Sequence, residues 1–214
     1  MNRKTNCYLV LSALFIGVLL ISNIAAVKLI SMGPFVLDGG AYLFPFSYIL
    51  CDVISEIFGF KKARMSIILG FCLAALASLC FLAVQITPAA PGWENQEAFE
   101  SILGFVPRIV LASLSAYFIG EMLNAFVLVK IKSKTGEKHL WLRLLGSTVI
   151  GEAADTLVFC TVAFYGIITG EEFLNYILTG YIYKCLLEVA LLPITYKVIA
   201  ALKKHISYDR GSSI

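Results

Sequence analysis

The stretch "FPFSYILCDVISEIFGFKKAR", residues 44–64, decides the fold because it determines how many times the chain crosses a membrane. Its apolar part is short, has Pro45 at its second position, and carries the acidic residues Asp52 and Glu56. A helix that spans a bilayer needs about 20 apolar residues. Three interpretations are therefore open for residues 42–59, namely a full crossing, a broken helix or a re-entrant hairpin.

The composition of the whole chain is that of a polytopic membrane protein. Its 214 residues are 59% hydrophobic and 14% charged, and the mean hydropathy is +0.86. Soluble domains are nearer 45–50% apolar and about 25% charged. The 6 cysteines form no C-x-x-C pair, so neither a disulfide framework nor a zinc site is indicated. We expect one all-α transmembrane domain over residues 1–214, without a metal or cofactor.

The distribution of charge indicates whether residues 42–59 cross the membrane. The apolar segments lie at about 7–30, 42–59, 65–86, 107–130, 143–168 and 176–200. If all six cross and the N-terminus is inside, most of the 17 Lys and Arg collect on the inner side, including those of "KKAR". The positive-inside rule therefore predicts six crossings with both termini cytoplasmic. In the longest outer loop, "EAFESILGF" (97–105) is expected to form one short interfacial helix.

Several ionisable and amide side chains lie inside these apolar segments. A charged side chain costs about 2.5–3.5 kcal/mol at the bilayer centre on insertion scales, so it indicates function by default. Snorkelling of the bases near helix ends and an i, i+4 pair on the sixth segment are structural alternatives. The acids outnumber the bases, which favours a ligand or ion pathway over hydrogen-bonded contacts between helices. The acids are Asp52, Glu56, Glu121, Glu152, Asp155 and Glu188, the bases are Lys28, Arg108 and Lys184, and the amides are Asn23 and Asn124.

The spacing of these residues places them on shared helix faces. Asp52 and Glu56 are one turn apart, and so are the polar residues of two similar stretches, "IGEMLNAFV" (119–127) and "IGEAADTLV" (150–158). The glycine in each stretch allows a neighbouring helix to approach closely. We therefore expect a polar cavity lined by the second, fourth and fifth segments and closed by the first and sixth.

The chemistry of such a cavity limits the ligand without identifying it. Carboxylates accept two adjacent N–H donors, as on the edge of a guanine, and amides satisfy a neighbouring carbonyl. An excess of acid also suits a cationic amine or the carriage of protons. The residues alone therefore predict a small polar solute, neutral to cationic, or protons. Stacking faces are available from Phe46, Tyr48, Tyr117, Phe159 and Tyr181.

Five stretches carry a resemblance to a known family: "SNIAAVK" (22–28), "FPFSYILCDVISEIFG" (44–59), "PRIVLASLSAYFIGEMLNAFVLVKIK" (107–132), "GSTVIGEAADTLVF" (146–159) and "YKCLLEVALLP" (183–193). Together they resemble the queuosine precursor transporter family, also called the vitamin uptake transporter family. The resemblance implies six helices and import of 7-deazaguanine bases for queuosine salvage, in the inner (plasma) membrane of a bacterium. Carried over residue by residue, the motif positions are Asn23, Lys28, Asp52, Arg108, Asp155, Thr156 and Lys184. Departures at Glu121, Asn124 and Glu152 leave open which deazapurine, cyano or aminomethyl, is preferred.

The predicted substrate-binding set combines these positions with the polar faces. It consists of Asn23, Lys28, Tyr48, Asp52, Glu56, Arg108, Glu121, Asn124, Glu152, Asp155, Thr156 and Lys184.

Other classes of protein compete with a stand-alone carrier. One is the substrate-binding subunit of an ATP-driven uptake complex for another small heterocycle. A separate subunit would then hydrolyse the ATP, because this chain has no GxxxxGK[ST] loop of its own. A channel is a further alternative. An enzyme is not expected, since neither an HExxH nor a GxGD motif is present. The expected partners are a small deazapurine and the lipid bilayer, with a homo-oligomer or an energy-coupling subunit left open. Nucleic acid is not expected, because no basic stripe with interleaved aromatics is present.

Overall fold

The computed structural model describes residues 3–135 and 140–211, and these are almost entirely helical. The six longest helices correspond to the six apolar segments, and a short helix lies where an interfacial helix was expected. The elements are α1 (Arg3–Ala25), β1 (Leu29–Met32), β2 (Phe35–Asp38), the 3-10 helix η1 (Gly39–Tyr42), α2 (Phe44–Phe58), α3 (Phe60–Gln85), α4 (Gln96–Leu103), α5 (Val106–Thr135), α6 (Leu140–Phe164) and α7 (Gly170–Gly211).

Four stretches of helix in the described residues are long and apolar enough to cross a membrane. They are Lys4–Ala25, Lys61–Gln85, Gln96–Gly120 and Gly170–Lys204. The prediction of a helical membrane protein is therefore confirmed in its coarse form. The count of six crossings and the orientation of the termini stay predictions.

The second apolar segment forms a helix that is too short to cross a bilayer by itself. With 15 residues and a rise of 1.5 Å per residue, α2 is about 22 Å long, whereas the hydrocarbon core is about 30 Å thick. It is joined to α3 through Gly59, whose φ of 84° is in the left-handed region. η1 and the two strands precede α2 at its N-terminal end.

The largest difference from the expected secondary structure is between α1 and α2. The first segment was expected to run to residue 30, but α1 ends at Ala25, and β1 and β2 form an antiparallel hairpin with Met32 opposite Phe35. A glycine at position 39 makes this possible, because a Cβ there would lie 2.5 Å from the carbonyl oxygen of Ala25. The hairpin therefore folds back onto the end of α1, at a contact that only glycine permits.

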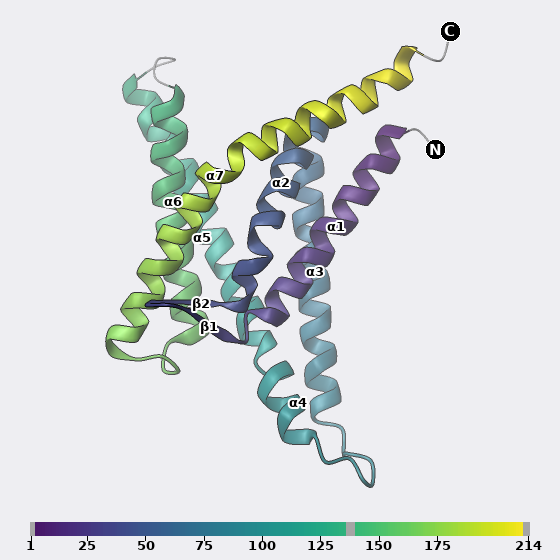
Figure 1. Ribbon diagram of the computed structural model, residues 1–214, viewed down its shortest axis with the longest axis vertical. Helices are drawn as coiled ribbons and strands as arrows, with labels where there is room; N and C mark the ends of the chain where they lie inside the picture. The colour runs from purple at the N-terminus through teal and green to yellow at the C-terminus, as the bar shows by residue number, and fades with distance from the viewer. Residues whose placement is uncertain (1–2, 136–139, 212–214) are drawn as a thin grey trace.

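The helices pack as two groups joined by α7 (Figure 1). α5 and α6 run antiparallel as one closely packed pair, and α1, α2 and α3 pack together beside them. At Gly120 of α5, a Cβ would lie 2.9 Å from the Asp155 Cβ and 3.1 Å from the Gly151 carbonyl oxygen, so the expected close approach is present. α7 crosses from one group to the other and changes direction along its length, with Pro193 inside it.

The direction of the helices places both ends of the chain at one end of the molecule. Figure 1 shows the start of α1, the α2–α3 junction and the end of α7 at the top of the view. The hairpin, α4 and the α6–α7 turn lie toward the opposite end. The core between these ends consists of small and aromatic side chains, with Ile109, Ala163, Phe164 and Tyr176 fully buried between α5, α6 and α7.

Candidate functional site

A cavity of about 410 Å³ lies between the two groups of helices. It is lined from α1, α2, α3, α5, α6 and α7, and also from the segment of β2 and η1. A volume in this range is typical of small-molecule sites, which measure about 300–1,000 Å³. The polar and charged side chains that line it are Ser22, Asn23, Asp38, Ser47, Asp52, Ser113, Tyr117, Glu152, Asp155, Thr156, Tyr176, Tyr183, Lys184 and Glu188.

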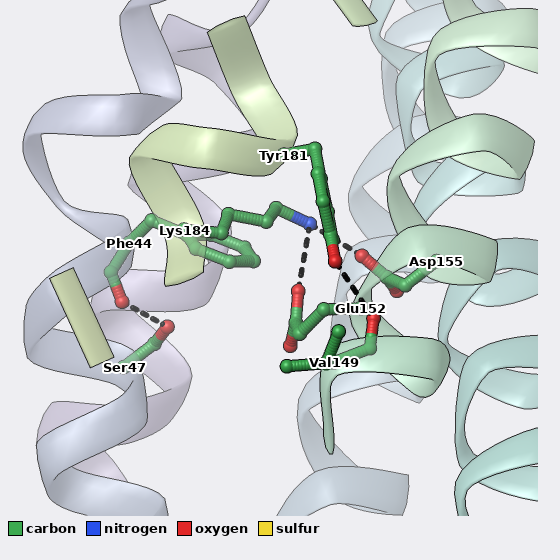
Figure 2. Close-up of polar contacts among 7 residues, drawn as sticks. All are labelled: Phe44, Ser47, Val149, Glu152, Asp155, Tyr181 and Lys184. Atoms are coloured by element: carbon green, nitrogen blue, oxygen red, sulfur yellow. Dashed lines mark hydrogen bonds and ion pairs between the residues drawn. The ribbon is translucent and has the colours of Figure 1, made fainter. Parts of the chain in front are cut away.

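Lys184 of α7 forms the charged centre of this cavity. Its Nζ forms an ion pair with Asp155 Oδ2 and lies 3.7 Å from Glu152 Oε2, both on α6. The ammonium also lies over the ring of Phe44 from α2, 4.7 Å from the ring centroid. Figure 2 shows the lysine side chain extending past this ring toward the two carboxylates. The interaction therefore connects three helices inside the cavity.

The sequence offered a different partner for this lysine. Lys184 and Glu188 are one turn apart on α7, and a pair within the helix was one interpretation. In the structure Lys184 instead pairs with the two acids of α6, while Glu188 lines the cavity separately. A pairing across helices is possible because the lysine side chain points from α7 toward α6 (Figure 2).

Thr156 presents a buried hydroxyl beside this centre. Its side chain is 2% exposed, and its Oγ1 has no hydrogen-bond partner in the part of the chain that the structure describes. A buried hydroxyl without a partner costs about 1–3 kcal/mol. Thr156 lines the cavity, so this hydroxyl faces a space in which it can form a further hydrogen bond.

The opposite wall of the cavity orients an amide. Asn23 of α1 donates from Nδ2 to the Leu19 carbonyl at 3.0 Å and accepts at Oδ1 from the Ser113 hydroxyl of α5 at 2.9 Å. These two contacts fix which atom of the amide faces which helix. Asn23 is buried, at 5% exposure, so its amide is a rigid part of the wall.

The end of the cavity near the hairpin contains an acid that the sequence did not single out. Asp38 accepts from the Tyr176 hydroxyl at 2.8 Å and from the Gly40 N–H at 2.9 Å. Sequence reasoning placed Asp38 in an outer loop, because its burial depends on a contact with Tyr176 of α7 that the local sequence does not record.

Two further contacts fasten this end to α7. The Tyr183 hydroxyl donates to the Ala41 carbonyl at 2.9 Å, and Asn175 Nδ2 donates to the Pro34 carbonyl at 3.1 Å. Together with the Tyr176–Asp38 bond, they attach the hairpin and η1 to the first half of α7. The residues between α1 and α2 thus form one wall of the cavity and not a free loop.

Acids outnumber bases among the described residues that line the cavity. The acids are Asp38, Asp52, Glu152, Asp155 and Glu188, whereas Lys184 is the only base in that part of the lining. Within the described residues no group of three or more His, Cys, Asp or Glu has the arrangement of a metal site. The arrangement can therefore accept several N–H donors or a positive charge.

Three residues of the predicted substrate-binding set lie away from the cavity. Lys28 is exposed beside the hairpin, and Glu56 forms an exposed ion pair with Lys203 at the far end of α7. Arg108 donates from Nε to the Val162 carbonyl at 2.8 Å and from Nη2 to the Tyr165 carbonyl at 2.7 Å. These carbonyls lie at the C-terminal end of α6, where backbone acceptors lack helical partners, so Arg108 caps that helix.

The other members of the set divide into two groups. Asn23, Asp52, Glu152, Asp155, Thr156 and Lys184 all line the cavity, although the structure by itself does not test their binding of a substrate. The predictions for Tyr48, Glu121 and Asn124 lie outside the described side chains.

Comparison with known proteins assigns the chain to a family. Residues 38–198 match the family model described as "Putative vitamin uptake transporter". This chain is a member of the vitamin uptake transporter family. The matched range covers most of the chain and includes Asp38, η1 and helices α2 to α6, which supply most of the cavity lining.

Curated relatives of this family member are named as transporters. The chain is 30% identical over 193 residues to a "Probable queuosine precursor transporter" of Bacillus subtilis, covering 90% of this chain and 82% of the relative. It is 28% identical over 163 residues to a "Queuosine precursor transporter" of Escherichia coli, covering 75% and 71% of the two chains. No solved structure matches the chain significantly. The relatives and the apolar helices indicate a multi-pass membrane protein, and the names point to a transporter and not to an enzyme.

Proposed function

We propose that this protein is a membrane transporter that imports queuosine precursors, the 7-deazaguanine bases, through the cavity between its helices. The observation that carries the proposal is that the cavity wall contains both the Asp155 carboxylate and the Thr156 hydroxyl, which has no hydrogen-bond partner within the described residues. The substrate class is that of the relatives, which are named as queuosine precursor transporters.

The cavity chemistry suits the polar edge of a deazaguanine. Such an edge carries adjacent N–H donors next to a carbonyl, and carboxylates accept the donors while a hydroxyl or amide serves the carbonyl. Asp155 and Glu152 are the acceptors on α6, and Thr156 is the hydroxyl. Phe44, Tyr117 and Phe159 also line the cavity and offer apolar faces to a flat ring.

The proposed topology has six crossings with both termini cytoplasmic, in the cell membrane of a bacterium. The common position of the chain ends in Figure 1 supports it, as does the collection of Lys and Arg near that end. In this topology α2 crosses together with η1 and the hairpin, of which Leu37, Asp38, Gly40 and Ala41 line the cavity. Irregular backbone at membrane depth is tolerated where it is buried against protein or lines a cavity.

The proposed mechanism is alternating access around the cavity. The ion pair of Lys184 with the α6 acids crosses the cavity, so it joins the α5–α6 pair to α7 in the state described here. An ATP-driven uptake complex for another heterocycle is not favoured, because the relatives are named as queuosine precursor transporters. Coupling to an ion or to the concentration gradient alone remains within this proposal.

The test is uptake of a radiolabelled 7-deazaguanine into proteoliposomes that contain the purified protein. We expect saturable uptake by the wild-type protein and at least a ~100-fold loss in Asp155→Asn, since an amide cannot accept two N–H donors in the same way. Lys203→Ala is the control, because it removes a lysine of the same helix outside the cavity. Normal uptake by Asp155→Asn, or no uptake by the wild type, would overturn the assignment.

A further inference from the structure

The surroundings of the Lys184 ammonium have the composition of a binding site for a primary amine. Two carboxylates, Glu152 and Asp155, approach it from α6, and the face of Phe44 covers it from α2. Carboxylates form the strong, charge-assisted hydrogen bonds to an ammonium, and an aromatic face adds a cation–π attraction. These are the groups with which proteins recognise ammonium ligands.

These groups form a built site and not a surface ion pair. The exposed fractions of the side chains are 13% for Lys184, 17% for Glu152 and 21% for Asp155. All of them line the cavity together with Phe44. Figure 2 shows the lysine entering from α7, while the carboxylates and the ring belong to other helices. The position of Nζ is therefore a position that a ligand inside the cavity can reach.

We propose that Phe44, Glu152 and Asp155 form a primary-ammonium subsite, that the chain fills it with its own Lys184, and that Lys184 thereby restricts the cavity to ligands without a positive charge. The first two parts concern the site itself, and the last part rests on the proposed function. Lys184 is in this view a specificity-determining residue of the transporter.

The restriction follows from charge. A ligand with an ammonium group can use Glu152 and Asp155 only by displacing Lys184 or by lying next to it. Displacement breaks a buried ion pair, and juxtaposition places two like charges together, which costs several kcal/mol. A neutral ligand avoids both costs, because it can donate N–H groups to the carboxylate oxygens while the ion pair persists.

The first test is chemical rescue, and it needs no deazapurine. Lys184→Ala should melt at a lower temperature than the wild type in detergent, and ethylammonium chloride should raise its melting temperature saturably. Acetamide and sodium chloride at the same concentrations serve as the neutral and ionic probes and should have no such effect. Lys203→Ala is the matched control, since Lys203 lies on the same helix as Lys184 and forms an exposed ion pair with Glu56 of α2. Equal responses of the two variants to ethylammonium would overturn the subsite.

The second test measures ligand selectivity, starting with the unaltered protein. We expect the wild type to bind the neutral cyano-deazaguanine at least about tenfold more tightly than the cationic aminomethyl form. Lys184→Met should reverse this order, whereas Lys184→Arg should retain it. A wild type that prefers the aminomethyl form, or an unchanged order in Lys184→Met, would overturn the restriction.

The two tests separate this inference from the proposed function. If the wild type binds neither deazaguanine but ethylammonium rescues Lys184→Ala, the proposed substrate is wrong and the ammonium subsite stands. If the wild type binds deazaguanines without rescue of Lys184→Ala, the substrate stands and the subsite is wrong. If Lys184→Ala does not fold, the order of affinities in the wild type still decides the restriction.

Discussion

Two of the lysine–carboxylate ion pairs of helix α7 share their chemistry and differ in their surroundings. Lys184 pairs with Asp155 inside the cavity, where the two side chains are 13% and 21% exposed. Lys203 pairs with Glu56 near the end of the helix bundle, where they are 52% and 54% exposed. An exposed pair contributes about 0–1 kcal/mol, whereas a buried pair pays a large desolvation cost and is expensive to break. We therefore expect the Lys203–Glu56 pair to contribute little to stability and the Lys184–Asp155 pair to hold the helices around the cavity together.

The sequence pattern does not distinguish the two pairs. Asp52 and Glu56 lie one turn apart on α2, as Glu152 and Asp155 do on α6, so both sets were expected at one cavity. In the structure α2 ends at Phe58, which places Glu56 in the last turn within reach of Lys203. Asp52, one turn earlier, lines the cavity. A shared helix face therefore does not imply a shared environment when the helix is short.

The largest effect should come from breaking the buried pair from the acid side. Asp155→Ala leaves the Lys184 ammonium with Glu152 at 3.7 Å as its remaining carboxylate, and loss of one partner of a buried pair costs about 3–5 kcal/mol. Glu56→Ala, the same change in the exposed pair, should cost about 1 kcal/mol or less. The measurement is the unfolding free energy of each variant in detergent with chemical denaturant.

A double-mutant cycle sharpens this result. The variant with both Asp155→Ala and Lys184→Ala should lose clearly less stability than the two single losses added together, because each single change leaves a buried charge behind. The corresponding cycle for Glu56 and Lys203 should be nearly additive. Coupling energies of similar size in the two cycles would contradict the distinction.

An intermediate effect is expected where α7 holds the hairpin. Tyr176 is 1% exposed, and its hydroxyl donates to Asp38, so Tyr176→Phe leaves a buried acceptor with one hydrogen bond fewer. The expected loss is about 1–3 kcal/mol, between those of the two ion pairs. Tyr181→Phe is the matched control, since the Tyr181 hydroxyl donates to the Val149 carbonyl at 3.2 Å from a more exposed position.

Thermal melting of both tyrosine variants measures this difference. A loss in Tyr181→Phe equal to that in Tyr176→Phe would mean that attachment of the hairpin contributes nothing beyond an ordinary hydroxyl contact. A larger loss in Tyr176→Phe would make the hairpin an integral wall of the cavity.

The apolar segments and the small residues predicted the helices well. They located all six long helices, the short α4 and the close contact at Gly120, because bilayer thickness and helix periodicity act on local sequence. The hairpin of β1 and β2 was missed, since it depends on a contact of Gly39 with the end of α1 that no local pattern records. Asp38 was missed for the same reason, as its burial comes from Tyr176, far away in the chain.

The sequence predicted which charged residues matter at the candidate site, but not which groups they pair with. Asp155, Glu152 and Lys184 stand out as charges in apolar sequence, and the structure brings them together. Arg108 stands out equally, yet it caps the carbonyls at the end of α6. A charge in an apolar segment shows that it needs a partner, but whether the partner is a ligand, a lysine or a helix end depends on tertiary packing.

The smallest expected effect is the response of the two ion pairs to salt. This comparison changes the solution and leaves the burial of both pairs as it is. Raising the salt concentration from about 0.1 M to about 1 M shortens the Debye length from about 10 Å to about 3 Å, which screens exposed charges far more than buried ones. The coupling energy between Lys203 and Glu56 should therefore fall toward zero, whereas that between Lys184 and Asp155 should persist. The measurement is the pair of double-mutant cycles repeated at both salt concentrations. If the Lys184–Asp155 coupling falls as steeply as the exposed one, water and ions reach the cavity freely in this state, and its lysine cannot act as a fixed occupant.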